Sequence, residues 1–135
     1  MFAARLWFAR LAVVYGLLIF SVLAWLYISA PLEHIDNFGI SATGSPESIS
    51  FLRAGPGALF LGMAVTALVG LLSPRHLRLC LEILVLFNGC IVAVRLLGIA
   101  VDGVTPAQLT ELRDEGISWL FFLAAWLAHP GQSDP

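Results

Sequence analysis

The sequence predicts an all-α membrane protein, a bundle of four transmembrane helices with both termini on the cytoplasmic side. Composition is the first reason, because 59% of the 135 residues are hydrophobic and 12% are charged, unlike a soluble domain. The second is that four apolar segments, each near the roughly 20 residues that cross a bilayer, nearly exhaust the chain. We therefore expect one integral membrane domain over residues 1–135, with spans at residues 8–29, 51–72, 79–101 and 109–128.

The third reason is the placement of the basic residues, all of which are arginine. Arg5 and Arg10 precede the first span and Arg75 and Arg78 follow the second, whereas residues 30–50 carry acids but no arginine. Basic residues concentrate in cytoplasmic loops, which places both termini in the cytoplasm. The absence of lysine is typical of GC-rich genomes and is a compositional indication of a bacterial source.

The first span, residues 8–29, must be distinguished from a signal peptide, because arginines precede it. Its apolar run is longer than the roughly 7 to 15 residues of a signal-peptide core. Trp7 lies at one end and Trp25 and Tyr27 at the other, as aromatic residues do at the two membrane interfaces. The pattern indicates a spanning helix.

Residues 30–50 are expected to form an external loop, because they are rich in proline, glycine and serine. The apolar residues Ile35, Phe38 and Ile40 would let part of this loop rest on the lipid headgroups.

The second span, residues 51–72, repeats a small residue at every fourth position: Ala54, Ala58, Gly62, Thr66 and Gly70. Small residues on one face of a membrane helix allow another helix to approach closely, so this face is expected to pack against a neighbour. Pro56 is expected in the first turn, where its missing N–H is tolerated, with Gly55 and Gly57 leaving room for a bend.

The third span, residues 79–101, follows a short turn over residues 73–78, and Arg78 and Glu82 are spaced for an ion pair. Deep in the span lies Arg95, which would cost about 2.5 to 3.5 kcal/mol at the centre of a membrane helix and therefore needs a partner. Asn88, Arg95 and Asp102 recur every seventh residue on one stripe of the helix. That stripe is expected to face protein rather than lipid.

The fourth helix has a capped start at Thr105 and Pro106. Its uninterrupted apolar part, residues 117–128, is short for a span. A start at residue 109 gives sufficient length but admits four charges into the first two turns, where insertion costs less than at the centre. We expect this helix to cross the membrane.

Charged residues gather at one depth near the outer surface. Arg95 and Glu115 each lie about 9 Å below the outer end of their helices, which predicts a direct or water-mediated ion pair. The candidate binding residues are Arg53, Arg95, Asp114 and Glu115, in a layer that also holds Asp102, Glu111 and Arg113. The interpretation we favour is that these charges neutralise one another and fix the helix register; the alternative is a pocket for a proton, an anion or a lipid headgroup. Glu111, Glu115, Ser118 and Phe122 share one helical face, which suits inward packing as well as proton relay.

No pattern in the sequence supports an enzyme, a metal site or a cofactor. Phosphate-loop, H-E-x-x-H, G-x-S-x-G and C-x-x-C motifs are absent from the sequence. His34, His76 and His129 are scattered, so we expect no shared metal site. Cys80 and Cys90 lie about 15 Å apart along one helix, beyond disulfide reach, and are expected to be inert. A net charge of -2 without a basic cluster argues against nucleic-acid binding.

Several short motifs occur in a recognisable order: Arg53 and Ala54 as a pair, Gly57 and Ala58, Gly62, Pro74 and Arg75 in a turn, then Arg95 and Glu115. This order resembles a domain-of-unknown-function family of small four-helix bacterial inner-membrane proteins, most clearly from residue 30 onward. Members often carry an aromatic residue where this chain has Gly55 and Pro56. The resemblance implies a four-helix inner-membrane protein and no established activity.

The sequence thus favours a structural or accessory membrane component in contact with membrane lipids, with a homo-oligomer or a larger membrane complex as candidate partners. The alternative is a small oligomeric transporter that binds its ligand at the charge layer, and a membrane enzyme acting on lipid or quinone ranks last.

Overall fold

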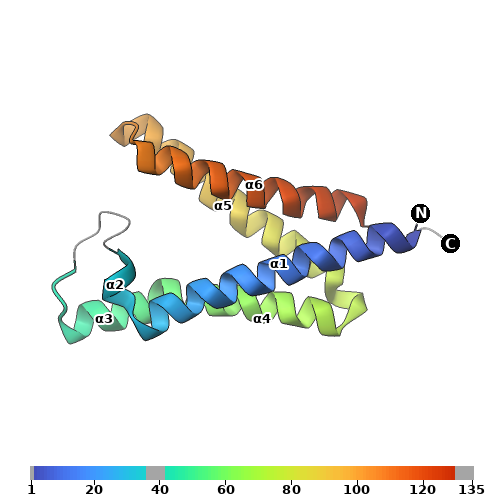
Figure 1. Ribbon diagram of the computed structural model, residues 1–135, viewed down its shortest axis with the longest axis horizontal. Helices are drawn as coiled ribbons and strands as arrows, with labels where there is room; N and C mark the ends of the chain where they lie inside the picture. The colour runs from blue at the N-terminus through green and yellow to red at the C-terminus, as the bar shows by residue number, and fades with distance from the viewer. Residues whose placement is uncertain (1, 36–41, 130–135) are drawn as a thin grey trace.

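A computed structural model of the chain describes residues 2–35 and 42–129, and every regular element within them is helical (Figure 1). The elements in chain order are α1 (Phe2–Ser29), α2 (Pro31–Ile35), α3 (Pro46–Leu52), a π-helical turn (Arg53–Gly57), α4 (Ala58–Leu72), a 3-10 turn (Pro74–His76), α5 (Leu77–Asp102) and α6 (Pro106–Ala128).

The four long helices form two pairs, α1 with α4 and α5 with α6 (Figure 1). The pairs pack against each other where the chain begins and where α6 ends, which we call the terminal end. They diverge toward the opposite end, where α5 connects to α6, which we call the loop end. The protein is therefore closed at one end and open at the other.

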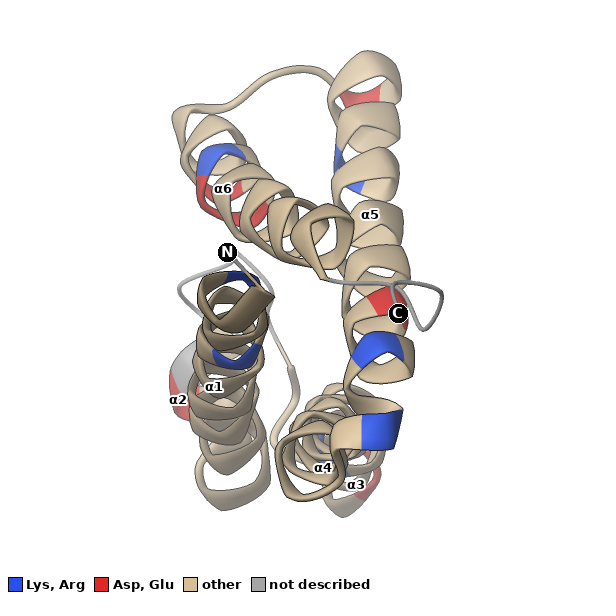
Figure 2. Ribbon diagram, turned by 90° about the vertical axis from the view of Figure 1, so that its right-hand side faces the viewer, with Lys and Arg blue, Asp and Glu red and all other residues tan. Residues whose placement is uncertain are grey.

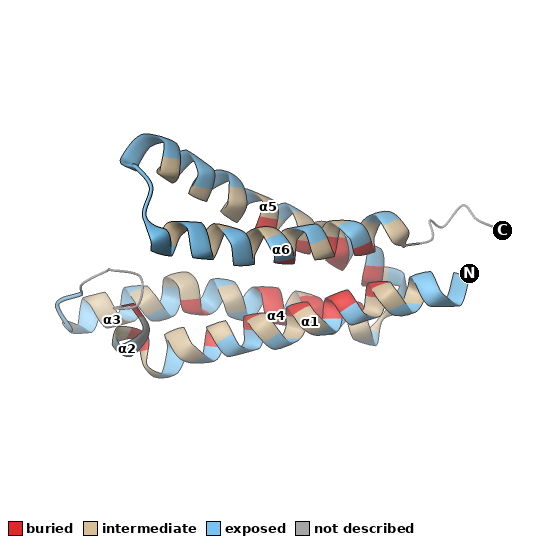
Figure 3. Cartoon of the chain, turned by 45° about the horizontal axis from the view of Figure 1, so that its top comes forward, coloured by how far each residue is buried: buried red, intermediate tan, exposed pale blue. Residues whose placement is uncertain are grey.

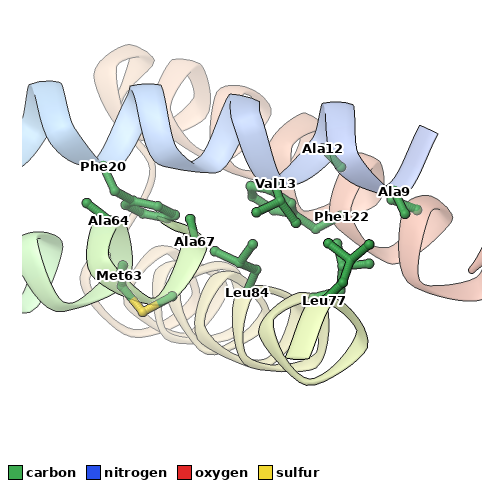
Figure 4. Close-up of a cluster of buried hydrophobic side chains, with 12 residues drawn as sticks. Ala9, Ala12, Val13, Phe20, Met63, Ala64, Ala67, Leu77, Leu84 and Phe122 are labelled. Atoms are coloured by element: carbon green, nitrogen blue, oxygen red, sulfur yellow. The ribbon is translucent and has the colours of Figure 1, made fainter. Parts of the chain in front are cut away.

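The core lies toward the terminal end and joins all four long helices (Figures 3 and 4). Its buried members are Ala9, Ala12, Val13, Phe20, Met63, Ala64, Ala67, Leu77, Leu81, Leu84, Phe122 and Ala125. Asn88 is the last buried residue of α5 and Ser118 the first of α6. Between them, over residues 89–117, every residue is at least partly exposed.

Three of the predicted spans match helical stretches that are long and apolar enough to cross a membrane: Phe2–Ser29, Pro46–Leu72 and Pro74–Asp102. The chain is therefore a helical membrane protein. The predicted fourth span corresponds to α6, which has 23 residues and begins at Pro106 rather than residue 109. Because its first half carries four charged residues, α6 is not apolar enough to be identified as a membrane span from length and composition alone.

The prediction of which face of the second span packs against a neighbour is wrong for most of the span. Ala54, Ala58 and Gly62 are exposed, and a Cβ atom added at Gly62 would meet no atom within 4 Å. The buried face consists instead of Met63, Ala64, Ala67 and Gly70, of which only Gly70 belongs to the predicted stripe. The packing face is turned away from the predicted stripe, so that Ala64 and Ala67 lie against α1 while Gly62 is exposed (Figure 4).

The start of the second span is also different from the prediction. The helix begins at Pro46, capped by the Ser45 side chain, which accepts a hydrogen bond from the Ser48 N–H. Pro56 therefore lies well inside the helix rather than in its first turn. The π-helical turn accommodates it, because a proline cannot donate the ordinary intrahelical hydrogen bond.

The expected external loop is partly helical. Short helices α2 and α3 lie at its two ends, and Ile35 is buried with 2% exposure. Phe38 and Ile40, which were expected at the headgroups, lie outside the described residues.

Two local predictions are confirmed. The turn into α5 is tight, and Arg78 Nε donates to Glu82 Oε1 at 3.3 Å. Thr105 caps α6: its side chain accepts from the Gln108 N–H at 3.2 Å, and Gln108 Oε1 accepts from the Thr105 N–H at 2.8 Å.

Candidate functional site

The central feature of the loop end is a guanidinium held by two carboxylates. Arg95 on α5 donates from Nε to Glu115 Oε2 and from Nη2 to Glu115 Oε1, both at 2.5 Å, and from Nη1 to Glu111 Oε2. The three side chains are about one quarter exposed. The Arg95–Glu115 ion pair predicted from matched depth is thus present, and it has the two-pronged geometry that makes arginine–carboxylate pairs strong.

The two carboxylates lie together because of helical spacing. Glu111 and Glu115 are four residues apart on α6, on the face that continues into Ser118, Phe122 and Ala125. Inward packing, one of the two interpretations of this face that the sequence left open, is observed for Ser118 and Phe122, which are buried. Sequence reasoning placed Glu111 only near the mouth of the layer, although its spacing from Glu115 was a signal of the direct contact.

The predicted stripe of α5 is correct for two of its three members. Asn88 is 6% exposed and donates from Nδ2 to the Leu84 carbonyl oxygen at 2.8 Å, and Arg95 faces α6. Asp102 is exposed at the last residue of α5. The stripe ends before Asp102 because the end of α5 lies apart from the start of α6 (Figure 3).

The other two candidate binding residues do not join Arg95 and Glu115. Asp114 is exposed and accepts a hydrogen bond from Arg113 Nε at 2.8 Å, because it projects from α6 one residue away from the inward face. Arg53 donates from Nε to the Ile28 carbonyl oxygen at 2.9 Å, on the opposite helix pair. Arg53 also borders an open hollow with Ile28, Pro46, Ile49, Ser50 and Ala54. The charge layer predicted from depth is therefore several separate contacts rather than one cluster. Figure 2 shows charged positions distributed over different helices.

The Arg95 cluster, which we define as Arg95, Glu111 and Glu115, carries one positive and two negative formal charges, or a net charge of -1. Both carboxylates bind the same guanidinium. An anion could reach the guanidinium only by displacing a carboxylate, and the residual field of the cluster would repel it. The cluster is accordingly unsuited to anions.

A cavity of about 490 Å³ lies beside the cluster. Its wall consists of Phe87, Cys90, Ile91, Val94, Arg95 and Gly98 from α5 and Gln108 from α6. The Phe87 ring packs edge-on against Phe20 of α1, with the ring centroids 5.7 Å apart, so this side of α5 faces the α1–α4 pair. The cavity therefore lies where the two helix pairs diverge, and apolar groups form most of its wall.

Polar contacts at the terminal end serve a different purpose. Arg5 Nε donates to the Ala128 carbonyl oxygen at 2.7 Å, and Trp126 Nε1 donates to Glu82 Oε1 at 3.2 Å. Each contact ties one helix to another near its end. The sequence analysis did not predict either, because both join residues far apart in the chain.

The two cysteines are free thiols, with Cys80 buried in the core and Cys90 exposed at the cavity. In the part of the chain that the structure describes, no group of three or more His, Cys, Asp or Glu side chains is arranged to hold a metal ion.

No protein-family model matches the chain, and no curated protein or solved structure is significantly similar to it.

Proposed function

We propose that the protein is a structural or accessory component of the bacterial inner membrane, in which the Arg95 cluster holds the open ends of α5 and α6 together. The observation that carries the proposal is that two carboxylates engage Arg95. Residues 89–117 have no buried member, so apolar packing contributes little to this part of the hairpin. An ion-paired arginine supplies the missing cohesion at a depth where an unpaired one would be costly.

The partners that fit this role are membrane lipids, a second copy of the chain or a larger membrane complex. Large apolar side chains remain exposed along the loop-end halves of α5 and α6, including Val94 at 68%, Leu97 at 62% and Ile117 at 60%. In a bilayer such a surface contacts acyl chains or other membrane helices. The order of short motifs supports membership of the small four-helix family that the chain resembles.

A double-mutant cycle tests the structural role. Arg95→Leu leaves two carboxylates without their cation, and should lower the free energy of unfolding by about 3 to 5 kcal/mol. Glu115→Leu should cost less, because Arg95 keeps Glu111. Combining the two changes should recover part of the loss, and replacing Glu111 as well should recover more.

Unfolding of the purified protein in detergent, followed by circular dichroism, gives these values. Strictly additive losses, or equal losses for Arg95→Leu and Glu115→Leu, would show that the cluster does not hold the hairpin.

We further propose that α6 crosses the membrane and that both termini are cytoplasmic. The arginine asymmetry and the even number of helices in the two pairs support this orientation. Single cysteines placed at residues 43, 104 and 131 of a chain lacking Cys80 and Cys90 test it. Labelling from outside is expected at the first two positions, and labelling at residue 131 would mean that α6 does not cross.

A small oligomeric transporter is the second candidate, and the cavity beside a net negative cluster favours it. Among the ligands considered from sequence, the charge of the cluster supports a proton over an anion.

A further inference from the structure

We infer that the cavity beside Arg95 binds a membrane quinone, a neutral ring with carbonyl oxygens and an apolar tail. This inference goes beyond the structural role proposed above, because it assigns a ligand to the open end and uses only the Arg95 N–H groups that the two carboxylates leave available. It rests on the hydrogen-bonding character of the wall, its charge and its position between the helix pairs.

The two polar residues of the wall both offer donors. A guanidinium has five N–H groups, and among the described residues the contacts of Arg95 with Glu111 and Glu115 use three of them. Gln108 has its Oε1 engaged by the Thr105 N–H, which fixes the amide so that its NH₂ group is the end left for a ligand. A matching ligand must therefore carry acceptor oxygens.

Charge excludes the commonest acceptors in a membrane, the phosphates of lipid headgroups. The cluster behind Arg95 has a net charge of -1, so an anionic group placed at the guanidinium would be repelled by two carboxylates. A neutral carbonyl oxygen can accept from the remaining N–H groups without this repulsion. Because the two carboxylates neutralise the guanidinium charge but leave N–H groups available, the site selects a neutral carbonyl compound.

The rest of the wall suits a flat ring. Phe87 lines the cavity and continues a row of aromatic side chains across the helix pairs: Phe87 with Phe20 at 5.7 Å, Phe20 with Phe60 at 6.1 Å, and Phe60 with Tyr27 at 5.7 Å between centroids. Gly98, also in the wall, has no side chain to occupy the space. An aromatic wall residue favours stacking by a planar ring, which an acyl chain does not offer.

The position of the cavity fits a ligand that arrives through the bilayer. Its wall residues on α5 lie within the stretch Pro74–Asp102, which is long and apolar enough to cross a membrane, and the volume is within the range of small-molecule sites. The cavity residues on α5 belong to the half of the helix that diverges from the α1–α4 pair (Figure 1). A quinone could place its ring inside while its tail remains among the lipids.

Binding is measured with the full chain in lipid nanodiscs, using decylubiquinone as the probe and tryptophan fluorescence as the signal. Trp119 is a suitable reporter, because its Nε1 lies 3.0 Å from where a Cβ of Gly89 would be, next to the cavity residue Cys90. We expect saturable quenching, lost when Trp119 is replaced by phenylalanine. Quenching without saturation would mean that the quinone only partitions into the lipid, and would overturn the inference.

Two substitutions locate the site. Gly98→Leu should abolish saturable quenching by filling the cavity, and the backbone should tolerate it, since a Cβ there meets only Asp102 Oδ2 at 3.8 Å. Gly62→Leu is the matched control, placed on an exposed face of α4 with no atom within 4 Å. Loss of binding in both variants, or in neither, would overturn the assignment to this cavity.

Gln108→Glu tests the donor requirement directly. The glutamate keeps an oxygen for the Thr105 N–H, and therefore the cap, but replaces the NH₂ donor by an acceptor. The affinity for decylubiquinone should fall about tenfold or more, while circular dichroism stays unchanged. Unchanged affinity would show that the donors do not recognise the ligand.

Competing ligands separate the quinone from other occupants. Decylubiquinol presents hydroxyl groups in place of carbonyls and should bind more weakly than the quinone. Diacylglycerol carries neutral ester carbonyls on flexible chains and should not compete. Equal binding of the quinol, or effective competition by diacylglycerol, would replace the quinone by a general lipid as the occupant. None of these outcomes depends on the stability of the Arg95 cluster, so failure here leaves the structural proposal standing.

Discussion

The terminal end and the loop end of this protein are held together by different forces. At the terminal end, four helices interlock through buried small and aliphatic side chains, and Ala9, Ala67, Leu77 and Phe122 are fully enclosed (Figure 4). At the loop end, no residue from 89 to 117 is buried, and the α5–α6 hairpin relies on the Arg95 cluster. Close packing therefore stabilises one end and ionic contacts the other.

The difference shows how a small membrane bundle can combine a fixed core with an open site. Dispersion between closely packed helices is the main cohesive force in lipid, and it requires small residues at the contact. The terminal end satisfies this requirement with alanines and glycines from α1 and α4. The loop end does not, and the space that it leaves unfilled is where a cavity and charged groups occur together.

The largest effect that should distinguish the two ends comes from Gly70→Leu. A Cβ at Gly70 would lie 2.8 Å from Cys80 Cβ and 3.0 Å from Cys80 Sγ, so any side chain must push α4 and α5 apart. We expect the free energy of unfolding to fall by about 3 kcal/mol or more, or the folded yield to be lost. Thermal unfolding in detergent measures the change.

Gly62→Leu provides the comparison on the same helix. It should leave the stability of the isolated protein unchanged, because its surroundings are open. The repeat of small residues predicts that leucine disrupts assembly at both glycines, whereas the structure has Gly70 buried against α5 and Gly62 exposed. A matching loss at Gly62 would place that face in contact with another helix, such as that of a second copy.

The fold was predictable from the sequence where a segment was long and almost entirely apolar, or where it held the residues typical of turns and helix caps. Apolar length located the helices, and proline, serine and threonine located the turn at Pro74 and the cap at Thr105. Helical periodicity did not identify the packing face of α4, because apolar residues surround a membrane helix on all sides. Residue size did not identify it either, since Gly62 is exposed while the larger Met63 is buried. The position of Pro56 was wrong because the helix starts earlier, within a segment whose composition is typical of a loop.

For the candidate site, the Arg95–Glu115 ion pair was predictable from the sequence, whereas the arrangement of the neighbouring charged residues was not. Depth along the helices was sufficient to match Arg95 with Glu115. Depth alone could not separate Asp114 from Glu115, since the two differ by one residue but face different directions. It also grouped Arg53 with the cluster, because the divergence of the helix pairs depends on tertiary packing that no local pattern records.

The smallest loss of stability that we expect to measure lies at the boundary between the two ends, where Tyr15 of α1 meets Ser118 of α6. The two hydroxyl oxygens are 2.7 Å apart, and Ser118 Oγ also donates to the Asp114 carbonyl oxygen at 3.0 Å. Since that contact uses the one proton of Ser118, Tyr15 must be the donor to Ser118. Tyr15→Phe then removes a donor and leaves an acceptor that tolerates the loss, at a cost of about 0.6 kcal/mol. Ser118→Ala should cost more, about 1 to 2 kcal/mol, because it leaves the Tyr15 hydroxyl without its acceptor. Thermal unfolding of both variants in detergent gives the order, and a larger loss for Tyr15→Phe would mean that the serine is the donor and that the Asp114 carbonyl is free of it.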